Sequence, residues 1–240
     1  NCSIVGVCDL FDVRAEEGIQ ASKNEIRPGS KSIQTATRYR HYKELLANDE
    51  IDAVIIATPD HWHARIAIDA AKAGKHVYCE KGLTRTFDEA IKVYDTIKET
   101  GIVFQLGHQN RQVEANEKAK QIIDQGLLGP INLVELTTNR NSPWGAWVWD
   151  IHPEGNARTI DWDTFQEPAP NKIPFGEEAL KRFFRWRMWF DYGTGLSGDL
   201  FSHDFDALNQ IMELGIPKYA SSTGGIYFYK DGRDVPDVWH

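Results

Sequence analysis

The stretch that decides the fold is residues 51–81, IDAVIIATPDHWHARIAIDAAKAGKHVYCEK. It opens with a continuous β-branched run, which is typical of a central parallel strand covered on both faces. A helix is predicted over residues 63–73, and it ends at Gly74, the residue type that helices favour at their carboxyl ends. Residues 76–79 form a second apolar run. This strand–helix–strand order predicts a βαβ crossover in a parallel sheet.

The same alternation extends to both sides of this stretch. Residues 3–9 predict a buried strand that ends at Asp9, and residues 102–106 predict another strand after Gly101. Apolar residues at helical spacing from Phe87 to Ile97 predict an amphipathic helix, capped by Thr84 or Thr86. Strands alternating with helices indicate a doubly wound parallel α/β domain that ends near residue 107.

Beyond residue 107 the pattern changes. Helices are predicted over residues 113–125 and 203–214, and strands over residues 131–138 and 226–229. Between them lies a long stretch rich in Trp, Pro and Asn, and loops of that length are usually functional. The change predicts a second domain.

Composition excludes several classes of protein. The 240 residues are 41% apolar and 26% charged, which excludes a disordered chain, a collagen and a disulfide-rich miniprotein. The net charge of −8 argues against a broad nucleic-acid surface. No run of 18 apolar residues is present, so no membrane-spanning helix is expected. The three cysteines lack the Cys-x-x-Cys spacing of a zinc site.

Two compositional features have two interpretations each. A basic cluster is interpreted as a solvated helix face or as part of a small anionic or polar site, and its alternative is a nucleic-acid contact. Its members are Lys181, Arg182, Arg185 and Arg187. Six of the eight tryptophans lie between residues 144 and 189. They serve either as core packing or as platforms on which a sugar stacks.

Polar residues follow the predicted strands at their carboxyl ends, where open α/β sheets bind ligands. Asp9 is placed to accept hydrogen bonds from a ribose hydroxyl and to repel a 2′-phosphate, which favours NAD over NADP. The alternative for Asp9 is a turn or helix-cap aspartate, and nearby Arg14 weakens the preference for NAD. His61 and His63 lack a third metal ligand, so we expect them to donate hydrogen bonds or face a ligand.

Two further candidates carry acid–base chemistry. Lys81 follows a predicted strand and can hydrogen-bond a substrate hydroxyl, unless it is a surface lysine in a turn. Asp199 and His203 are four residues apart, so in a helix they share a face, where an aspartate can orient a basic imidazole. Their alternative is a helix N-terminal charge and a satisfied polar histidine.

Together, three motifs in this order resemble the Gfo/Idh/MocA oxidoreductases, the family of glucose–fructose oxidoreductase and inositol dehydrogenase. They are Ala57-Thr58-Pro59-x-x-x-His63, Ala73-Gly74-Lys75-His76-Val77-Tyr78-Cys79-Glu80-Lys81 and Asp199-x-x-x-His203. The resemblance spans nearly the whole chain. It implies a Rossmann domain over residues 1–107, whose first strand and glycine loop would precede Asn1. Over residues 108–240 it implies an α+β domain on an open, mostly antiparallel sheet, incomplete at its carboxyl end.

The resemblance also implies roles for individual residues. Lys81, Asp199 and His203 match the family's catalytic residues. The cofactor-binding residues that it implies are Asp9, Thr58, Pro59, His61, His63, Glu80, Lys81 and Gln109. The substrate-binding residues that it implies are Asn110, Arg140 and Trp189. No metal is expected, and Gly82 departs from the family pattern, which has proline there and a more rigid turn.

The function that the resemblance implies is NAD(P)-dependent hydride transfer to or from a hydroxyl-bearing carbon of a sugar, polyol or glycoside. One alternative is an NAD-dependent redox-assisted glycosidase or lyase, which would release an aglycone without accumulating NADH. Another is a non-catalytic sugar or nucleotide sensor on the same fold. The expected partners are a small sugar or polyol and further copies of the chain, with no nucleic acid. The expected compartment is the cytoplasm, and the alternative is export to a bacterial periplasm.

Overall fold

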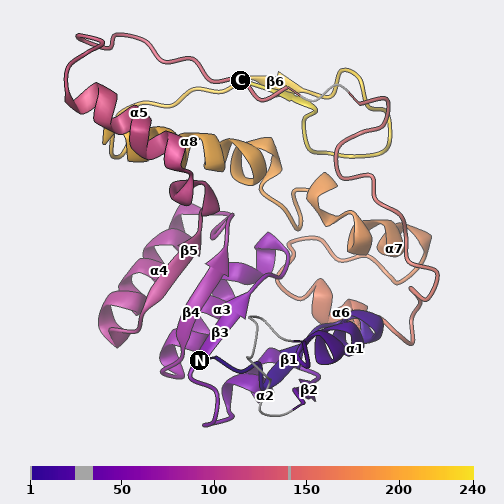
Figure 1. The fold of residues 1–240 in the computed structure, drawn as a ribbon. Coiled ribbons are helices and arrows are strands. Elements are labelled where there is room, and N and C mark those ends of the chain that lie inside the picture. Colours follow the sequence, from indigo (N-terminus) through magenta and orange to yellow (C-terminus); the bar gives the residue numbers. More distant parts are fainter. Residues whose placement is uncertain (1, 25–34, 140–141) are drawn as a thin grey trace.

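The N-terminal part of the computed structural model contains two parallel sheets (Figure 1), and the structure as a whole describes residues 2–24, 35–139 and 142–240. The first sheet pairs β1 (Gly6–Cys8) with β2 (Thr37–Tyr39). The second has the order β3 (Ala53–Ile56), β4 (His76–Glu80) and β5 (Phe104–Gly107). Every pair in both sheets is parallel, as predicted. Within the described ranges, β1 and β3 are not paired, so the sheets are separate.

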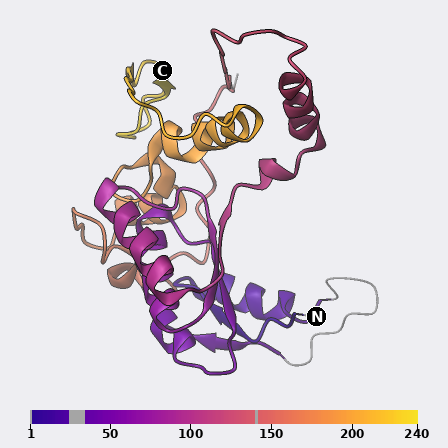
Figure 2. The same cartoon turned by 90° about the vertical axis from the view of Figure 1, so that its left-hand side faces the viewer.

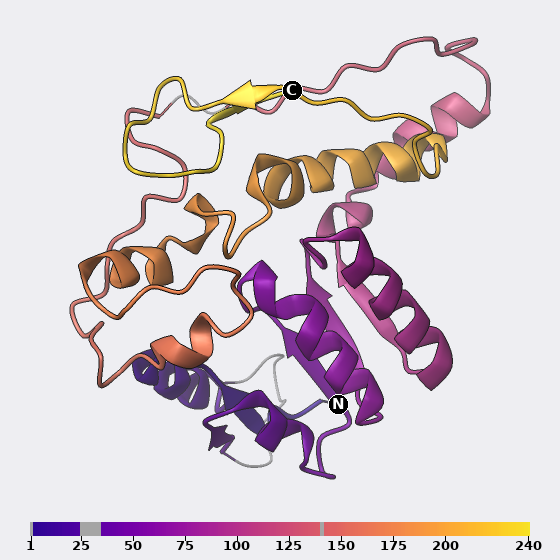
Figure 3. The ribbon, with the colours of Figure 1, turned by 180° about the vertical axis from the view of Figure 1, so that it is seen from behind.

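Helices connect these strands. They are α1 (Asp12–Ala21), α2 (Tyr42–Leu46), α3 (Asp60–Lys72) and α4 (Phe87–Thr100). Figure 3 shows α3 lying across the three-stranded sheet, where it contacts β3, β4 and α4. The predicted start of α3 at His63 is wrong by one turn, because the helix already begins after Pro59.

The ends of α4 follow the sequence, but its buried face does not. Thr86 and Glu89 form a capping box, and Gly101 ends the helix at φ 65°. The predicted apolar face is partly exposed: Phe87 is 79% exposed, whereas the buried side chains are those of Val93 and Thr96. Spacing alone therefore predicted the helix correctly and misplaced its contact face.

The C-terminal part is mostly helical and irregular. Its elements are the 3-10 turn η1 (Gln109–Gln112), α5 (Glu114–Asp124), α6 (Trp162–Phe165), α7 (Glu177–Phe184), the 3-10 turn η2 (Trp186–Met188), the π-helical turn η3 (Ser197–Phe201) and α8 (Ser202–Met212). α8 contacts α5 and η1, and in Figure 2 it lies above the purple and magenta N-terminal part of the chain. His203 in the first turn of α8 packs against His108, the residue that follows β5.

Two predicted strands are wrong. Residues 131–138 form no strand, and residues 226–229 form bends and irregular chain instead. A strand needs a ladder partner, and within the described residues the antiparallel pairing here is limited to β6 (Gly224–Gly225) with β7 (Val238–Trp239). A larger antiparallel sheet, which the resemblance implies, stays a prediction.

A large aromatic core joins the two parts of the chain. Phe11, next to α1, packs edge-on against Phe183 and Phe184 of α7. Phe11 also bridges to Ile160, and the backbone of Asp161 donates to Leu10 O at 2.9 Å. The domain boundary at residue 107 stays a prediction, because this core spans it.

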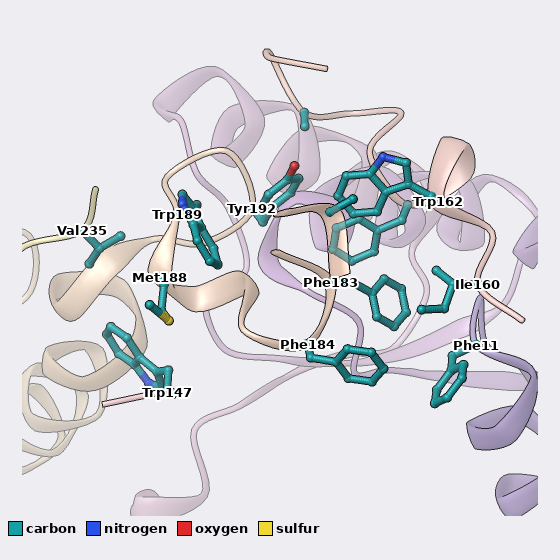
Figure 4. Close-up of a cluster of buried hydrophobic side chains, with 13 residues drawn as sticks. Phe11, Trp147, Ile160, Trp162, Phe183, Phe184, Met188, Trp189, Tyr192 and Val235 are labelled. Carbon is teal, nitrogen blue, oxygen red and sulfur yellow. The ribbon is translucent and has the colours of Figure 1, made fainter. Parts of the chain in front are cut away.

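Three tryptophans confirm the core-packing interpretation. Trp147, Trp162 and Trp189 are between 4% and 5% exposed and belong to this core (Figure 4). Trp144 and Trp149 are instead 68% and 52% exposed. None of the described helices combines the length and the apolar character that crossing a membrane requires.

Candidate active site

The centre of the candidate site is an ion-pair cluster between the end of β4 and the π-helical turn η3. Lys81 Nζ donates to Asp199 Oδ1 at 2.5 Å and to the Asp199 carbonyl at 2.7 Å. Arg187 Nε donates to the same carboxylate oxygen at 3.0 Å. Two predicted catalytic residues, Lys81 and Asp199, are thus brought together from positions 118 residues apart. π-helical turns are frequent at functional sites.

The electrostatics of this cluster keep Asp199 charged. The residue is 5% exposed, and burial alone would raise its pKa. The hydrogen bond and charge of Lys81, together with those of Arg187, outweigh burial and hold the pKa of Asp199 below its usual value. An ammonium group has three donors, and the two contacts with Asp199 use two of them. The third N–H of Lys81 can therefore serve a substrate oxygen.

The predicted pairing of Asp199 with His203 is not formed. Asp199 lies in the π-helical turn, where hydrogen bonds join residues five apart, and its carboxylate faces Lys81 and Arg187. His203 lies in the first turn of α8 and packs edge-on against His108, with ring centroids 5.6 Å apart. Nδ1 of each ring is buried and has no hydrogen-bond partner among the described residues.

His108 is a site residue that the sequence analysis missed. It directly follows β5, at the same sheet edge as Lys81, and this position is what could have indicated it. Burial lowers the pKa of His108. The nearby charges of His203, Arg111 and Lys81 lower it further, and only the charge of Asp206 opposes them. His108 is therefore a neutral ring at neutral pH, with one unpaired buried nitrogen beside another on His203.

Asp9 is a turn aspartate in this structure, and its contact with a ribose stays a prediction. Its Oδ1 accepts a hydrogen bond from the Phe11 backbone N–H at 2.8 Å, as a turn aspartate does. Its Oδ2 is bonded to no residue of the described chain, so it can still accept from a ribose hydroxyl. Burial raises the pKa of Asp9, against the Phe11 N–H and the charge of Arg14. Arg14 itself lies over the ring of Phe184, 5.6 Å from its centroid.

The turn between β3 and α3 carries Thr58, Pro59 and His63. Thr58 Oγ1 is buried and has no hydrogen-bond partner in the described structure, so its hydroxyl has unused hydrogen-bonding capacity. The His63 ring is 1% exposed and lies between two carbonyl oxygens, Thr58 O at 2.6 Å and Gly82 O at 3.0 Å. His63 therefore links this turn to the turn that follows Lys81 through its two hydrogen bonds, and its buried ring stabilises both turns.

The predicted cofactor role of His61 is contradicted by its position. The residue is 4% exposed, and its Nε2 donates to Phe165 O at 2.7 Å. Its ring packs against Phe165 and Tyr192, with centroids 5.1 and 5.2 Å away. His61 lies in the first turn of α3, and its ring faces Phe165 of α6.

Gly82 packs closely against the side chains of Asp60 and Thr194. A Cβ at this position would lie 3.1 Å from Thr194 Oγ1 and 3.2 Å from Asp60 Oδ2. Thr194 Oγ1 donates to that Asp60 oxygen at 2.6 Å, so the pair fills the space beside Gly82. The departure from the family pattern at Gly82 thus accompanies a specific contact between α3 and the segment before η3.

The structure places some of the remaining predicted site residues at the sheet edge and others away from it. Gln109 Nε2 donates to Glu80 Oε1 at 3.0 Å, so these two predicted cofactor residues are neighbours at the sheet edge. Asn110 lies in the exposed turn η1. Trp189 is 4% exposed within the aromatic core, which contradicts its predicted contact with substrate. Arg140 lies outside the described residues.

Arg187 was visible in the sequence only as a member of the basic cluster, and its contact with Asp199 makes it part of the site. The polar-site interpretation of that cluster stays a prediction. Arg182 instead pairs with Glu178 and Asp191, away from Lys81. Across the described ranges, no three His, Cys, Asp or Glu side chains converge to hold a metal.

This chain is similar to known proteins in sequence and in fold. Residues 4–108 match the family model described as "Oxidoreductase family, NAD-binding Rossmann fold", of the GFO_IDH_MocA family. Levoglucosan dehydrogenase from Pseudarthrobacter phenanthrenivorans is 30% identical over 184 residues, which are 77% of this chain and 41% of that protein. Glycosyl hydrolase family 109 protein 1 from Shewanella sp. strain MR-4 is 36% identical over 158 residues, 66% of this chain and 34% of that protein.

Among solved structures, the NAD-binding protein from Listeria innocua has the same fold, with a TM-score of 0.59 and 23% identity. The match covers 98% of this chain and 53% of that one. The matches to the two curated relatives, levoglucosan dehydrogenase and the glycosyl hydrolase family 109 protein, each cover less than half of that relative's length. The family match and the sequence relatives lead to one conclusion: the chain belongs to the Gfo/Idh/MocA family of oxidoreductases with an NAD-binding Rossmann fold.

Proposed function

We propose that this protein is an NAD(P)-dependent dehydrogenase that transfers hydride between nicotinamide and a hydroxyl-bearing carbon of a sugar or polyol. The observation that carries the proposal is the contact of Lys81 with Asp199 at the carboxyl edge of β4. Ligands of open α/β sheets bind at this edge. The similarity to levoglucosan dehydrogenase supports a sugar as the substrate.

The strand-end residues fit a dinucleotide. Asp9 has an open carboxylate oxygen for a ribose hydroxyl, and its charge favours NAD over NADP. Thr58 contributes a buried hydroxyl without a described partner after β3, in the other parallel sheet. Bound NAD would supply the hydride acceptor, and the protein contributes position and electrostatics.

The side chains of the site bind the reacting oxygen, accept its proton and position one another. Lys81 donates its third N–H to the reacting oxygen. His203 takes the hydroxyl proton, a transfer that contributes about 10²–10⁴-fold to rate in enzymes generally. Asp199 positions Lys81 rather than His203, since its carboxylate faces Lys81 and Arg187. His108, packed against His203, fixes the orientation of that ring.

The test is NADH formation with a panel of sugars and polyols that includes levoglucosan. Lys81→Ala and His203→Ala should each abolish it. Lys92→Ala is the matched control, because Lys92 is an exposed residue of α4 and leaves the site intact. Turnover at the wild-type rate in both site variants would contradict the proposal.

A redox-assisted glycosidase is the second candidate, because a glycosyl hydrolase family 109 protein is similar over 66% of the chain. In that reaction the cofactor is recycled. Release of the aglycone from an aryl glycoside, with NAD present and no NADH accumulating, would favour this candidate. NADH accumulating in proportion to consumed sugar would favour the dehydrogenase.

A further inference from the structure

An arginine–tryptophan cluster lies beside the Lys81–Asp199 contact, and it consists of Trp149, Arg185, Trp186 and Arg187. The guanidinium carbon of Arg187 is 4.0 Å from the ring centroid of Trp186 and 5.5 Å from that of Trp149. Arg187 Nε is bonded to Asp199 at 3.0 Å. The two indoles and the carboxylate therefore hold the guanidinium group in one place next to the candidate catalytic lysine.

The cluster carries more positive charge than the site neutralises. The terminal nitrogens of Arg187 donate no hydrogen bond to any residue in the described ranges. Arg185 donates through Nε to Trp149 O at 2.6 Å and pairs with no described carboxylate. Lys81 and Arg187 thus share the carboxylate of Asp199, and Arg185 has no carboxylate partner in the described ranges, in a chain whose net charge is −8. A local excess of cations favours an anionic ligand.

The backbone that presents Trp149 is strained. Trp147, two residues earlier, has φ 67°, a left-handed conformation that bulky side chains rarely adopt. The Trp147 indole is buried in the aromatic core, while Trp149 is 52% exposed. The Trp149 backbone N–H donates to Trp147 O at 3.0 Å, which closes the turn. Strain of this kind persists mainly where binding or catalysis needs it.

We propose that the arginine–tryptophan cluster binds the anionic group of an acidic sugar, either a carboxylate or a phosphate ester. The planar fork of Arg187 suits two parallel hydrogen bonds to oxygens of either group. The exposed indole of Trp149 offers an apolar surface to the sugar ring. The inference rests on the proposed dehydrogenase function, because it names the substrate class of the same site.

The test is isothermal titration of the NAD-loaded protein with glucose, glucuronate and glucose 6-phosphate, repeated with the galactose series. At least one anionic sugar should bind about 10- to 100-fold more tightly than its neutral counterpart. Arg187→Met should remove most of that preference. Arg187→Lys keeps the charge without the fork and should retain part of it. The preferred anionic sugar identifies the bound group as carboxylate or phosphate.

Arg187 also contacts Asp199, so its substitution can damage the site as a whole. The decisive quantity is therefore the affinity for the anionic sugar divided by the affinity for its neutral counterpart, and the same ratio of kcat/KM values. General damage to the site lowers both members of a pair and leaves this ratio unchanged. Arg185→Met leaves the contacts of Asp199 intact, and it should lower the ratio severalfold by removing one cation.

Equal affinity for neutral and anionic sugars in the wild-type protein would overturn the inference. Undetectable binding of every anionic sugar, or a preference that survives in Arg187→Met, would overturn it as well. NADH formation from neutral sugars alone would leave the proposed function intact. Absence of NADH from every sugar would contradict the proposed function, while the titration would still decide the role of the cluster.

Discussion

Mild acid should destabilise this protein through His61. The ring is buried, its Nε2 proton is donated to Phe165 O, and its Nδ1 has no partner among the described residues. A second proton would therefore sit on a buried atom that has no acceptor among the described residues. Burial lowers the pKa of His61 to about 3, from 6.5 for an ordinary histidine.

The sign and size of the effect follow from proton linkage. The pKa of His61 is lower in the folded state, so the unfolded chain binds more protons between these two values. Stability is therefore present above pH 6.5 and is lost as the pH falls below it. Between pH 7 and pH 5 the unfolded ring becomes mostly charged, while the folded ring stays neutral. Linkage gives a loss of about 2 kcal/mol in the free energy of unfolding over this interval.

Urea unfolding at pH 7 and pH 5, followed by tryptophan fluorescence, measures this loss. His61→Gln is the matched variant, because an amide can still donate to Phe165 O and does not titrate. The other seven of the eight histidines are common to both proteins. The wild-type protein should lose about 2 kcal/mol more than the variant between the two pH values. Equal losses would refute the assignment of a neutral, buried His61.

Three further substitutions test packing and specificity. Gly82→Ala should crowd the contact of Thr194 with Asp60 and lower kcat about tenfold by displacing Lys81, and an unchanged kcat would contradict this. Phe11→Ala should reduce the free energy of unfolding by about 3–5 kcal/mol in urea titrations, whereas a loss below about 1 kcal/mol would mean that the aromatic core does not depend on this ring. Asp9→Ser should raise kcat/KM with NADP relative to NAD by on the order of tenfold, and a constant ratio would exclude Asp9 from the ribose site.

The parallel sheet could be predicted because its information is local. The β-branched run at residues 53–56 and the ending of α4 at Gly101 each depend on a few adjacent residues. The carboxyl ends of parallel strands meet at one edge, so Lys81 could be placed near the site before any long-range contact was known.

What the sequence could not provide depends on distant contacts. Trp149 and Trp189 have the same side chain, and the left-handed backbone at Trp147 and the packing of the aromatic core decide which is exposed. The spacing of Asp199 and His203 suggested an α-helical pair, but a π-helical turn carries Asp199.

The burial of His61 is equally invisible in the sequence. It is set by Phe165 and Tyr192, more than 100 residues away. The strand predicted over residues 131–138 fails for a related reason, since apolar alternation cannot form a strand without a paired neighbour.

The most direct test of the account is to denature the protein, purified without added nucleotide, and to identify any released nucleotide by mass spectrometry. The account predicts released NAD, or tight binding of NAD in a direct titration when none is carried through purification. If no nucleotide is released and the protein binds neither NAD nor NADP, the result would contradict the proposed dehydrogenase. The interpretation would then move to a sugar sensor on the same fold.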